Sequence, residues 1–142
     1  PMNKKMKKLL LGGLAIGGVA AVYAATKKKD TAAIVLKENL TEGFLWQYTV
    51  EKEGIVREYR SDYLPMFGGS DGEAESGQHK WVFAPVKAGE TVLRFSYVRP
   101  WESDEPAAAT AAYRVVVDSQ RKITITLLEH SPNFEEYALS AR

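Results

Sequence analysis

The feature that most constrains the fold of this chain is an alternation of apolar and polar residues that recurs from Thr31 onward. In the clearest run, 44–52, the apolar residues fall on one face of an extended strand: Phe44, Trp46, Tyr48 and Val50. Similar runs, separated by turn residues, lie at 32–38, 55–60, 79–86, 90–99, 111–118 and 122–129. This period of two, with almost no helical periodicity, predicts an all-β chain that forms an antiparallel sandwich or barrel.

Length and composition fit one globular domain without covalent cross-links. The chain has 142 residues, of which 45% are apolar and 26% charged, a balance that argues against disorder. It contains no cysteine, which excludes disulfides, thiolate zinc sites and a cysteine nucleophile. Seven lysines and no acid precede Asp30, so 12 of the 19 basic residues remain against all 18 acidic ones. A net acidic domain is not expected to bind nucleic acid.

Residues 1–30 are predicted to be a signal peptide or an N-terminal membrane anchor. Lysines come first, an apolar stretch runs from Leu9 to Ala25, and small residues surround a cleavage site before Ala25. The stretch is short for a membrane span and diluted by glycines, so cleavage is the first interpretation and a retained anchor the second. In both cases we expect an exported, extracytoplasmic domain that meets a membrane only through this leader.

Strands that reverse direction at each turn place every second connection at the same end of a sandwich. The connections 39–43, 61–78 and 99–110 are therefore expected to cluster at one end, with short turns at the other. Immunoglobulin-like sandwiches gather their binding loops in this way. The sequence thus predicts an immunoglobulin-like antiparallel β-sandwich over 31–130, followed by a polar C-terminal tail, 131–142, with room for one short helical turn.

The three connections have both a plain structural interpretation and a functional one. Asn39 and Gly43 suit a tight turn, and the glycine-rich length of 61–78 suits a flexible loop with a functional role. Trp101 either folds back over the core or stands exposed, and the sequence leaves both open. Pro100 stiffens the chain before it, and a rigidly presented tryptophan beside an arginine has the composition of a binding hot spot.

Catalytic and metal sites find little support in the sequence. The two histidines, His79 and His130, lie in or at the end of strand patterns, outside any nucleophile-elbow or zinc-helix motif. The acidic residues of the glycine-rich connection miss the spacing of a calcium loop: Asp71, Glu73 and Glu75. We therefore expect no enzyme, no metal and no cofactor.

The first and third connections resemble those of the chagasin family of cysteine-protease inhibitors, immunoglobulin-like proteins that block papain-like peptidases. The family's first loop follows N-P-T-T-G-[YF]-x-W, and this chain has Asn39-Leu40-Thr41-Glu42-Gly43-Phe44-Leu45-Trp46. The family's third loop, R-P-W, is matched completely by Arg99-Pro100-Trp101. The middle loop, G-x-G-G, is matched weakly and in two registers, Ala74-Glu75-Ser76-Gly77 or Gly68-Gly69.

The resemblance implies a reversible, competitive protein inhibitor that wedges three loops, 39–43, 68–78 and 99–105, into the active-site cleft of a papain-like cysteine protease. The loop around Thr41 would lie over the catalytic centre, Trp101 would pack on the primed side, and the middle loop would hold the opposite side. The protease-contacting residues implied are Asn39, Leu40, Thr41, Glu42, Gly43, Phe44, Ser76, Gly77, Gln78, Arg99, Pro100, Trp101 and Glu102. We expect the inhibitor to act as a monomer.

A second interpretation is an immunoglobulin-like adhesion or scaffold module of the cell surface, which explains the fold and the leader but not the two loop motifs. The resemblance raises one topological question. The family has a further strand before the one matched by 32–38, for which this chain leaves few residues after the leader. Our hypothesis is that the extra C-terminal strand, 122–129, fills part of that role.

Overall fold

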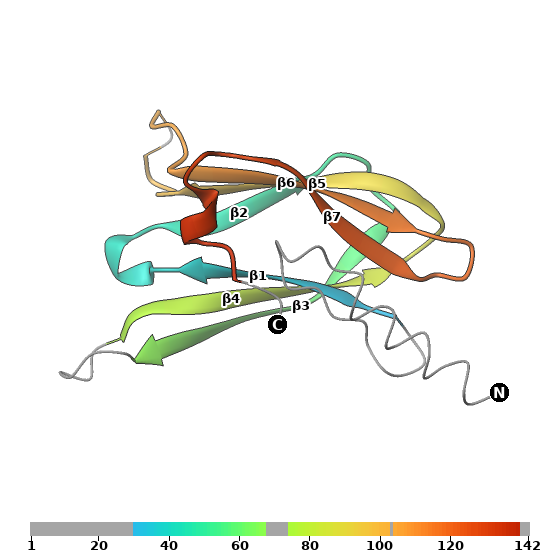
Figure 1. The fold of residues 1–142 in the computed structure, drawn as a ribbon, viewed down its shortest axis with the longest axis horizontal. Coiled ribbons are helices and arrows are strands. Elements are labelled where there is room, and N and C mark those ends of the chain that lie inside the picture. Colours follow the sequence, from blue (N-terminus) through green and yellow to red (C-terminus); the bar gives the residue numbers. More distant parts are fainter. Residues whose placement is uncertain (1–29, 68–73, 103, 140–142) are drawn as a thin grey trace.

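The protein is an immunoglobulin-like sandwich of two antiparallel sheets, seen edge-on as two layers in Figure 1, which confirms the predicted fold class. The structure is a computed structural model that describes residues 30–67, 74–102 and 104–139. Its strands are β1 (Ala32–Glu38), β2 (Leu45–Val50), β3 (Val56–Phe67), β4 (Ala74–Pro85), β5 (Gly89–Val98), β6 (Ala109–Val117) and β7 (Ile123–His130). Two 3-10 turns, η1 (Leu40–Glu42) and η2 (Phe134–Glu136), complete the described elements.

One sheet has three strands in the order β1-β4-β3, and the other has four in the order β2-β5-β6-β7. The predicted C-terminal strand is therefore part of a sheet, because β7 pairs with β6 at the edge of the larger one. The chain crosses from the first sheet to the second directly after β1, through η1. This crossover puts η1 at one end of the sandwich, between the two layers (Figure 1).

The core lies between the sheets and is rich in aromatic rings. In the strands other than β3, alternate residues point inward, as the period-two pattern predicted, and most of them are less than a tenth exposed. β3 contributes only Val56 to this core. Trp46 sits in the middle of one aromatic cluster, with ring centroids 4.8 Å from Tyr97, 5.8 Å from Tyr137 and 6.2 Å from Phe134. Such edge and stacked contacts add to the burial of apolar area that holds the sheets together.

The C-terminal segment contributes to this core. Phe134 in η2 is completely buried, and the backbone N–H of Lys37 donates to the carbonyl oxygen of Tyr137 over 2.8 Å. Ala138 forms an isolated bridge with Leu36. The region predicted as a polar tail thus lies along the edge of β1 and covers Trp46 from one side.

The prediction of a loop over 61–78 is wrong, because most of that segment is strand. β3 continues to Phe67 and β4 begins at Ala74, and their pairing includes Pro65 opposite Gly77. β3 is an edge strand, where proline is tolerated because one side of the strand needs no donor. Polar residues on such a strand carry no alternating signal, so the pairing was hidden in the sequence. The remaining connection, 68–73, which includes the Gly68-Gly69 register, lies outside the described residues.

Within the part of the chain that the structure covers, no helix is long and apolar enough to cross a membrane. The predicted leader, residues 1–29, is not among the described residues.

Candidate functional site: one end of the sandwich

Two connections and the adjoining ends of two paired strands lie at the same end of the sandwich. Figure 1 shows η1, the 99–108 connection and the adjoining ends of β3 and β4 together on one side. Gly77 of β4 pairs with Glu38, the residue directly before the first connection. The hairpin of β3 and β4 therefore runs alongside the first connection.

The first connection is held in a compact turn by its own residues. The side-chain oxygen Oδ1 of Asn39 accepts hydrogen bonds from the backbone N–H of Thr41, over 3.0 Å, and from its hydroxyl. The backbone N–H of Gly43 donates to the carbonyl oxygen of Leu40 over 3.0 Å. Gly43 has a φ of +84°, which a residue with a Cβ adopts only with strain. The turn interpretation of Asn39 and Gly43 was thus correct, and Leu40 remains 45% exposed at its surface.

The third connection is a proline-stiffened turn that presents an indole ring. The backbone N–H of Glu102 donates to the carbonyl oxygen of Arg99 over 2.9 Å, which places Pro100 and Trp101 at the two central positions. Proline suits the first of these because its ring fixes φ. Of the two alternatives that the sequence left open for Trp101, the structure shows exposure: the side chain is 66% accessible.

The first and third connections contact each other directly. A Cβ added to Gly43 would overlap the six-membered ring of Trp101, so only glycine permits this approach. The Arg99 guanidinium lies over the Phe44 ring, 4.5 Å from its centroid, and Arg99 Nε donates to the carbonyl oxygen of Glu42 over 3.3 Å. Two motifs more than fifty residues apart in sequence therefore form one surface.

Tyr97 supports this surface from below. Its ring stacks on Phe44 at a centroid distance of 5.2 Å, and its hydroxyl oxygen accepts the backbone N–H of Asn39 over 2.7 Å. Burial raises the pKa of Tyr97 above the usual value for tyrosine, although the hydrogen bond from Asn39 opposes the shift. The hydroxyl therefore stays neutral and keeps its place under the start of the first connection.

The predicted residues of the middle loop lie in strand β4. Ser76, Gly77 and Gln78 all pair with β3, and Gly77 is buried against the Tyr63 hydroxyl, where a Cβ would overlap it. Gly77 is therefore required by close packing between neighbouring strands. On the adjacent strand the structure shows an exposed apolar residue that the sequence analysis did not select: Leu64, 62% accessible.

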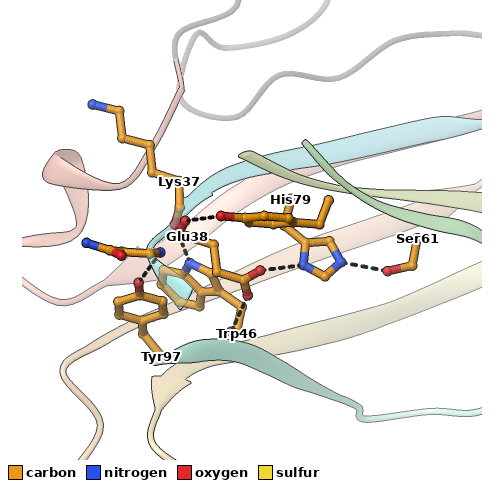
Figure 2. Close-up of polar contacts among 8 residues, drawn as sticks. Lys37, Glu38, Trp46, Ser61, His79 and Tyr97 are labelled. Atoms are coloured by element: carbon orange, nitrogen blue, oxygen red, sulfur yellow. Dashed lines mark hydrogen bonds and ion pairs between the residues drawn. The ribbon is translucent and has the colours of Figure 1, made fainter. Parts of the chain in front are cut away.

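A polar network under the first connection was also missed. Figure 2 shows Glu38 between Trp46 and His79, with Ser61 beyond the imidazole. Glu38 Oε2 accepts the backbone N–H of Trp46 over 2.7 Å, and Glu38 Oε1 lies 2.8 Å from His79 Nδ1. His79 Nε2 lies 2.6 Å from Ser61 Oγ. One sequence signal could have revealed it, because Glu38 shares the inward face of β1 with Ala32, Ile34 and Leu36.

The serine–histidine–glutamate order of this network is also that of a hydrolytic triad. Ser61, however, lies within the twelve-residue strand β3, whereas nucleophiles and oxyanion-binding N–H groups are commonly presented at sharp turns or helix starts. The His79 ring is further held flat against Trp81, at a centroid distance of 3.9 Å. These contacts describe a network that ties strands together. Among the described residues, no group of three or more acidic or histidine side chains could hold a metal ion.

Comparisons with known proteins agree with the fold and with the family resemblance. A family model described as chagasin family peptidase inhibitor I42 matches residues 25–116, about two thirds of the chain. The crystal structure of a cysteine protease inhibitor from Entamoeba histolytica, EhICP2, superposes with a TM-score of 0.57 at 22% sequence identity. The superposition covers 62% of this chain and 78% of the other. The comparison with curated proteins gave no match.

Proposed function

Because the chain belongs to the chagasin family of peptidase inhibitors, we propose that it is a reversible, competitive inhibitor of papain-like cysteine proteases. The observation that supports this proposal most directly is the joining of the first and third connections into one surface with exposed apolar residues. Trp101 and Leu40 stand out from that surface at 66% and 45% accessibility. An exposed indole beside an arginine has the composition of a binding hot spot.

The first connection would cover the catalytic cysteine without being cleaved. Leu40, Thr41 and Glu42 form a 3-10 turn, and its carbonyl oxygens at Asn39 and Leu40 already accept backbone hydrogen bonds. Thiolate attack needs an extended peptide whose carbonyl carbon is aligned with the nucleophile, and a small misplacement lowers the rate strongly. A turn held by Asn39 and Gly43 does not offer that alignment. The inhibitor would therefore block the active site without being cleaved.

The third connection would provide most of the binding free energy. Trp101 and Pro100 are held in a defined turn, and Arg99 is already engaged with Phe44 and Glu42. Little conformational entropy remains to be lost when such a turn enters a cleft. The end of the β3–β4 hairpin, with exposed Leu64 on β3, would contact the other wall of the cleft.

The proposal is tested by titrating a papain-like protease with the full chain and following hydrolysis of a small peptide substrate. We expect inhibition that reaches completion, is relieved by increasing substrate, and is reversed on dilution with the inhibitor intact. A serine protease of similar size serves as the control and should be unaffected. Complete failure to inhibit several papain-like enzymes would contradict the proposal and favour an adhesion or scaffold module.

A further inference from the structure

We propose that Glu38 is a positioning residue, whose buried carboxylate fixes the first connection in its inhibitory shape and links it to the β3–β4 hairpin. The inference rests on the proposed function and assigns a role to a residue outside the family's loop motifs. Glu38 is 2% exposed, immediately before Asn39 and at the end of β1. It is one of only two buried polar or charged residues in the described part of the chain.

The first half of the argument concerns the two ends of the first connection. Glu38 lies on the β1 side, and its Oε2 accepts the N–H of Trp46 on the β2 side over 2.7 Å. A second bond runs parallel to it, because Trp46 Nε1 donates to the carbonyl oxygen of Lys37 over 2.8 Å. β2 is an edge strand, so the backbone N–H of Trp46 finds its partner, Glu38, in the other sheet. The two bonds set the distance between the strands that the connection joins.

The second half concerns the hairpin. The carboxylate only accepts hydrogen bonds, so the His79 Nδ1 atom, 2.8 Å from Oε1, carries the proton. Nε2 is then free to accept the Ser61 hydroxyl over 2.6 Å. These hydrogen bonds link Glu38 on β1 to His79 on β4 and then to Ser61 on β3. β3 and β4 form the hairpin beside the first connection. Tyr63 on β3 adds a longer bond of 3.4 Å from its hydroxyl to the carbonyl oxygen of Glu38.

Burial makes this arrangement selective for one geometry. A buried carboxylate that loses a partner keeps its desolvation penalty, so each bond resists displacement more strongly than it would at the surface. A satisfied network centred on this buried carboxylate therefore holds its strands in one relative position. Removing the carboxylate should loosen the first connection while leaving the rest of the sandwich folded.

The test compares the full chain with Glu38→Ala and Glu38→Gln, with Val117→Ala as a control for general loss of stability. Val117 is 2% exposed and lies near the opposite end of the sandwich, at the end of β6. For Glu38→Ala we expect dissociation from the protease to accelerate roughly tenfold, the factor that the loss of one charged hydrogen bond corresponds to. We also expect slow cleavage of the variant within 39–44 by the protease, visible as two fragments by mass spectrometry.

Glu38→Gln should restore slow dissociation and resistance to cleavage. Its amide oxygen can accept from Trp46, and its amide nitrogen can donate to His79 once the imidazole proton moves to Nε2. Val117→Ala should lower the melting temperature without changing dissociation or cleavage. Dissociation and cleavage of Glu38→Ala that equal those of the wild type would overturn the proposal, as would the same changes in Val117→Ala. Should Glu38→Ala not fold, His79→Gln is measured instead and is expected to change both quantities in the same direction.

A failure of the proposed function is distinguished by the wild-type chain, which would then not inhibit at all. The role of Glu38 is in that event tested on the free protein by amide hydrogen exchange. Faster exchange of the 40–44 amides in Glu38→Ala than in Val117→Ala supports the positioning role. Equal exchange in the two variants contradicts it.

Discussion

The two ends of this sandwich differ in where their polar groups find partners. At one end, the turn between β6 and β7 is closed by Asp118, whose Oδ1 accepts the N–H groups of Gln120 and Lys122 over 2.8 and 2.9 Å. At the other end, bonds run between distant segments, such as the one from Asn39 to the Tyr97 hydroxyl, 58 residues away. The first end thus includes a self-contained turn, although backbone bonds also join other segments there, as between Ile55 and Val86. The second end differs because two connections contact each other and present exposed apolar side chains as one surface.

The difference shows which parts of the fold serve chain reversal and which serve recognition. A turn that satisfies its own backbone groups needs no neighbour and can be changed with local consequences only. The end with η1 and Trp101 instead keeps large apolar side chains at its surface, at the expense of solvation, and fixes them through contacts between connections. Such exposed and rigid apolar side chains are typical of binding sites. Stability and inhibition should therefore respond to different substitutions.

The largest expected effect is on stability and comes from the end that holds the β6–β7 turn. Ile55 is 1% exposed, and its carbonyl oxygen accepts the N–H of Val86 over 2.8 Å. Ile55→Ala should lower the free energy of unfolding by about 2–5 kcal/mol, because it removes buried methyl groups and leaves a cavity. Urea unfolding measures this loss. The inhibition constant at a temperature where the variant is folded should be unchanged, and a tenfold weaker inhibition would break the comparison.

The next effect is on inhibition and comes from the other end. Trp101→Ala should weaken inhibition by about 2 kcal/mol or more, the loss expected for a central tryptophan. The free energy of unfolding should change little, because the side chain is 66% exposed. Tyr59→Ala is the matched control, since Tyr59 is an aromatic residue of β3 with 52% exposure. Equal inhibition by Trp101→Ala and the wild type would show that the indole is not an anchor.

The sequence predicted the elements of this fold better than their extent. All seven predicted strands are present, and the alternation that predicted them is clearest where one face is buried, as in β5. The β3–β4 hairpin was underestimated, by the residues 61–67 of β3 and 74–78 of β4, since edge residues such as Asp62 and Pro65 carry no apolar pattern. The packing of Phe134 and Tyr137 was hidden for a similar reason, because two rings in a short polar segment do not establish a period.

The candidate site was predictable where its backbone geometry depends on residues close together in the sequence. Asn39 and Gly43 indicate a turn in the sequence, and that turn formed as expected. Pro100 indicates a stiff backbone before Trp101, and in the structure it occupies a turn closed by Arg99 and Glu102. The burial of Glu38 had a sequence signal, its place on the inward face of β1, but its partners were not predictable, because they come from other strands, 8 and 41 residues away. Contacts of that kind depend on strand register and sheet packing, which the sequence pattern does not specify.

A smaller effect is expected from two glycines with positive φ, of which one contacts Trp101 and the other contacts no side chain. Gly43 and Gly54 both have positive φ, +84° and +92°, but only Gly43 lies against another side chain. Each change to alanine should lower the free energy of unfolding by about 1–2 kcal/mol through backbone strain. Gly43→Ala should in addition displace Trp101 and weaken inhibition, whereas Gly54→Ala should not. Thermal unfolding and inhibition constants for the two variants test this, and equal inhibition by both would mean that the contact with Trp101 has no role.

The smallest expected effect is a gain in stability in the core that both ends share. The Tyr113 hydroxyl is buried, makes no hydrogen bond to any described residue, and burial raises the pKa of Tyr113 above 10. Tyr113→Phe should therefore stabilise the protein by about 1 kcal/mol at neutral pH, because an unpaired buried hydroxyl is removed. Inhibition should be unchanged, since Tyr113 packs on Phe95 in the interior of the sandwich.

The same substitution also has a pH signature. A phenol whose pKa is raised on folding favours the folded state fully below its unfolded value of 10, and this contribution is lost as pH rises beyond it. The folded wild type holds the Tyr113 proton that the unfolded chain releases, so its stability should fall more steeply above pH 10 than that of Tyr113→Phe. Part of the fall should persist in the variant, because burial also raises the pKa of Tyr97 and Tyr137. Urea unfolding at neutral pH and above pH 10 measures both slopes, and parallel slopes would mean that Tyr113 is hydrated or hydrogen-bonded in solution.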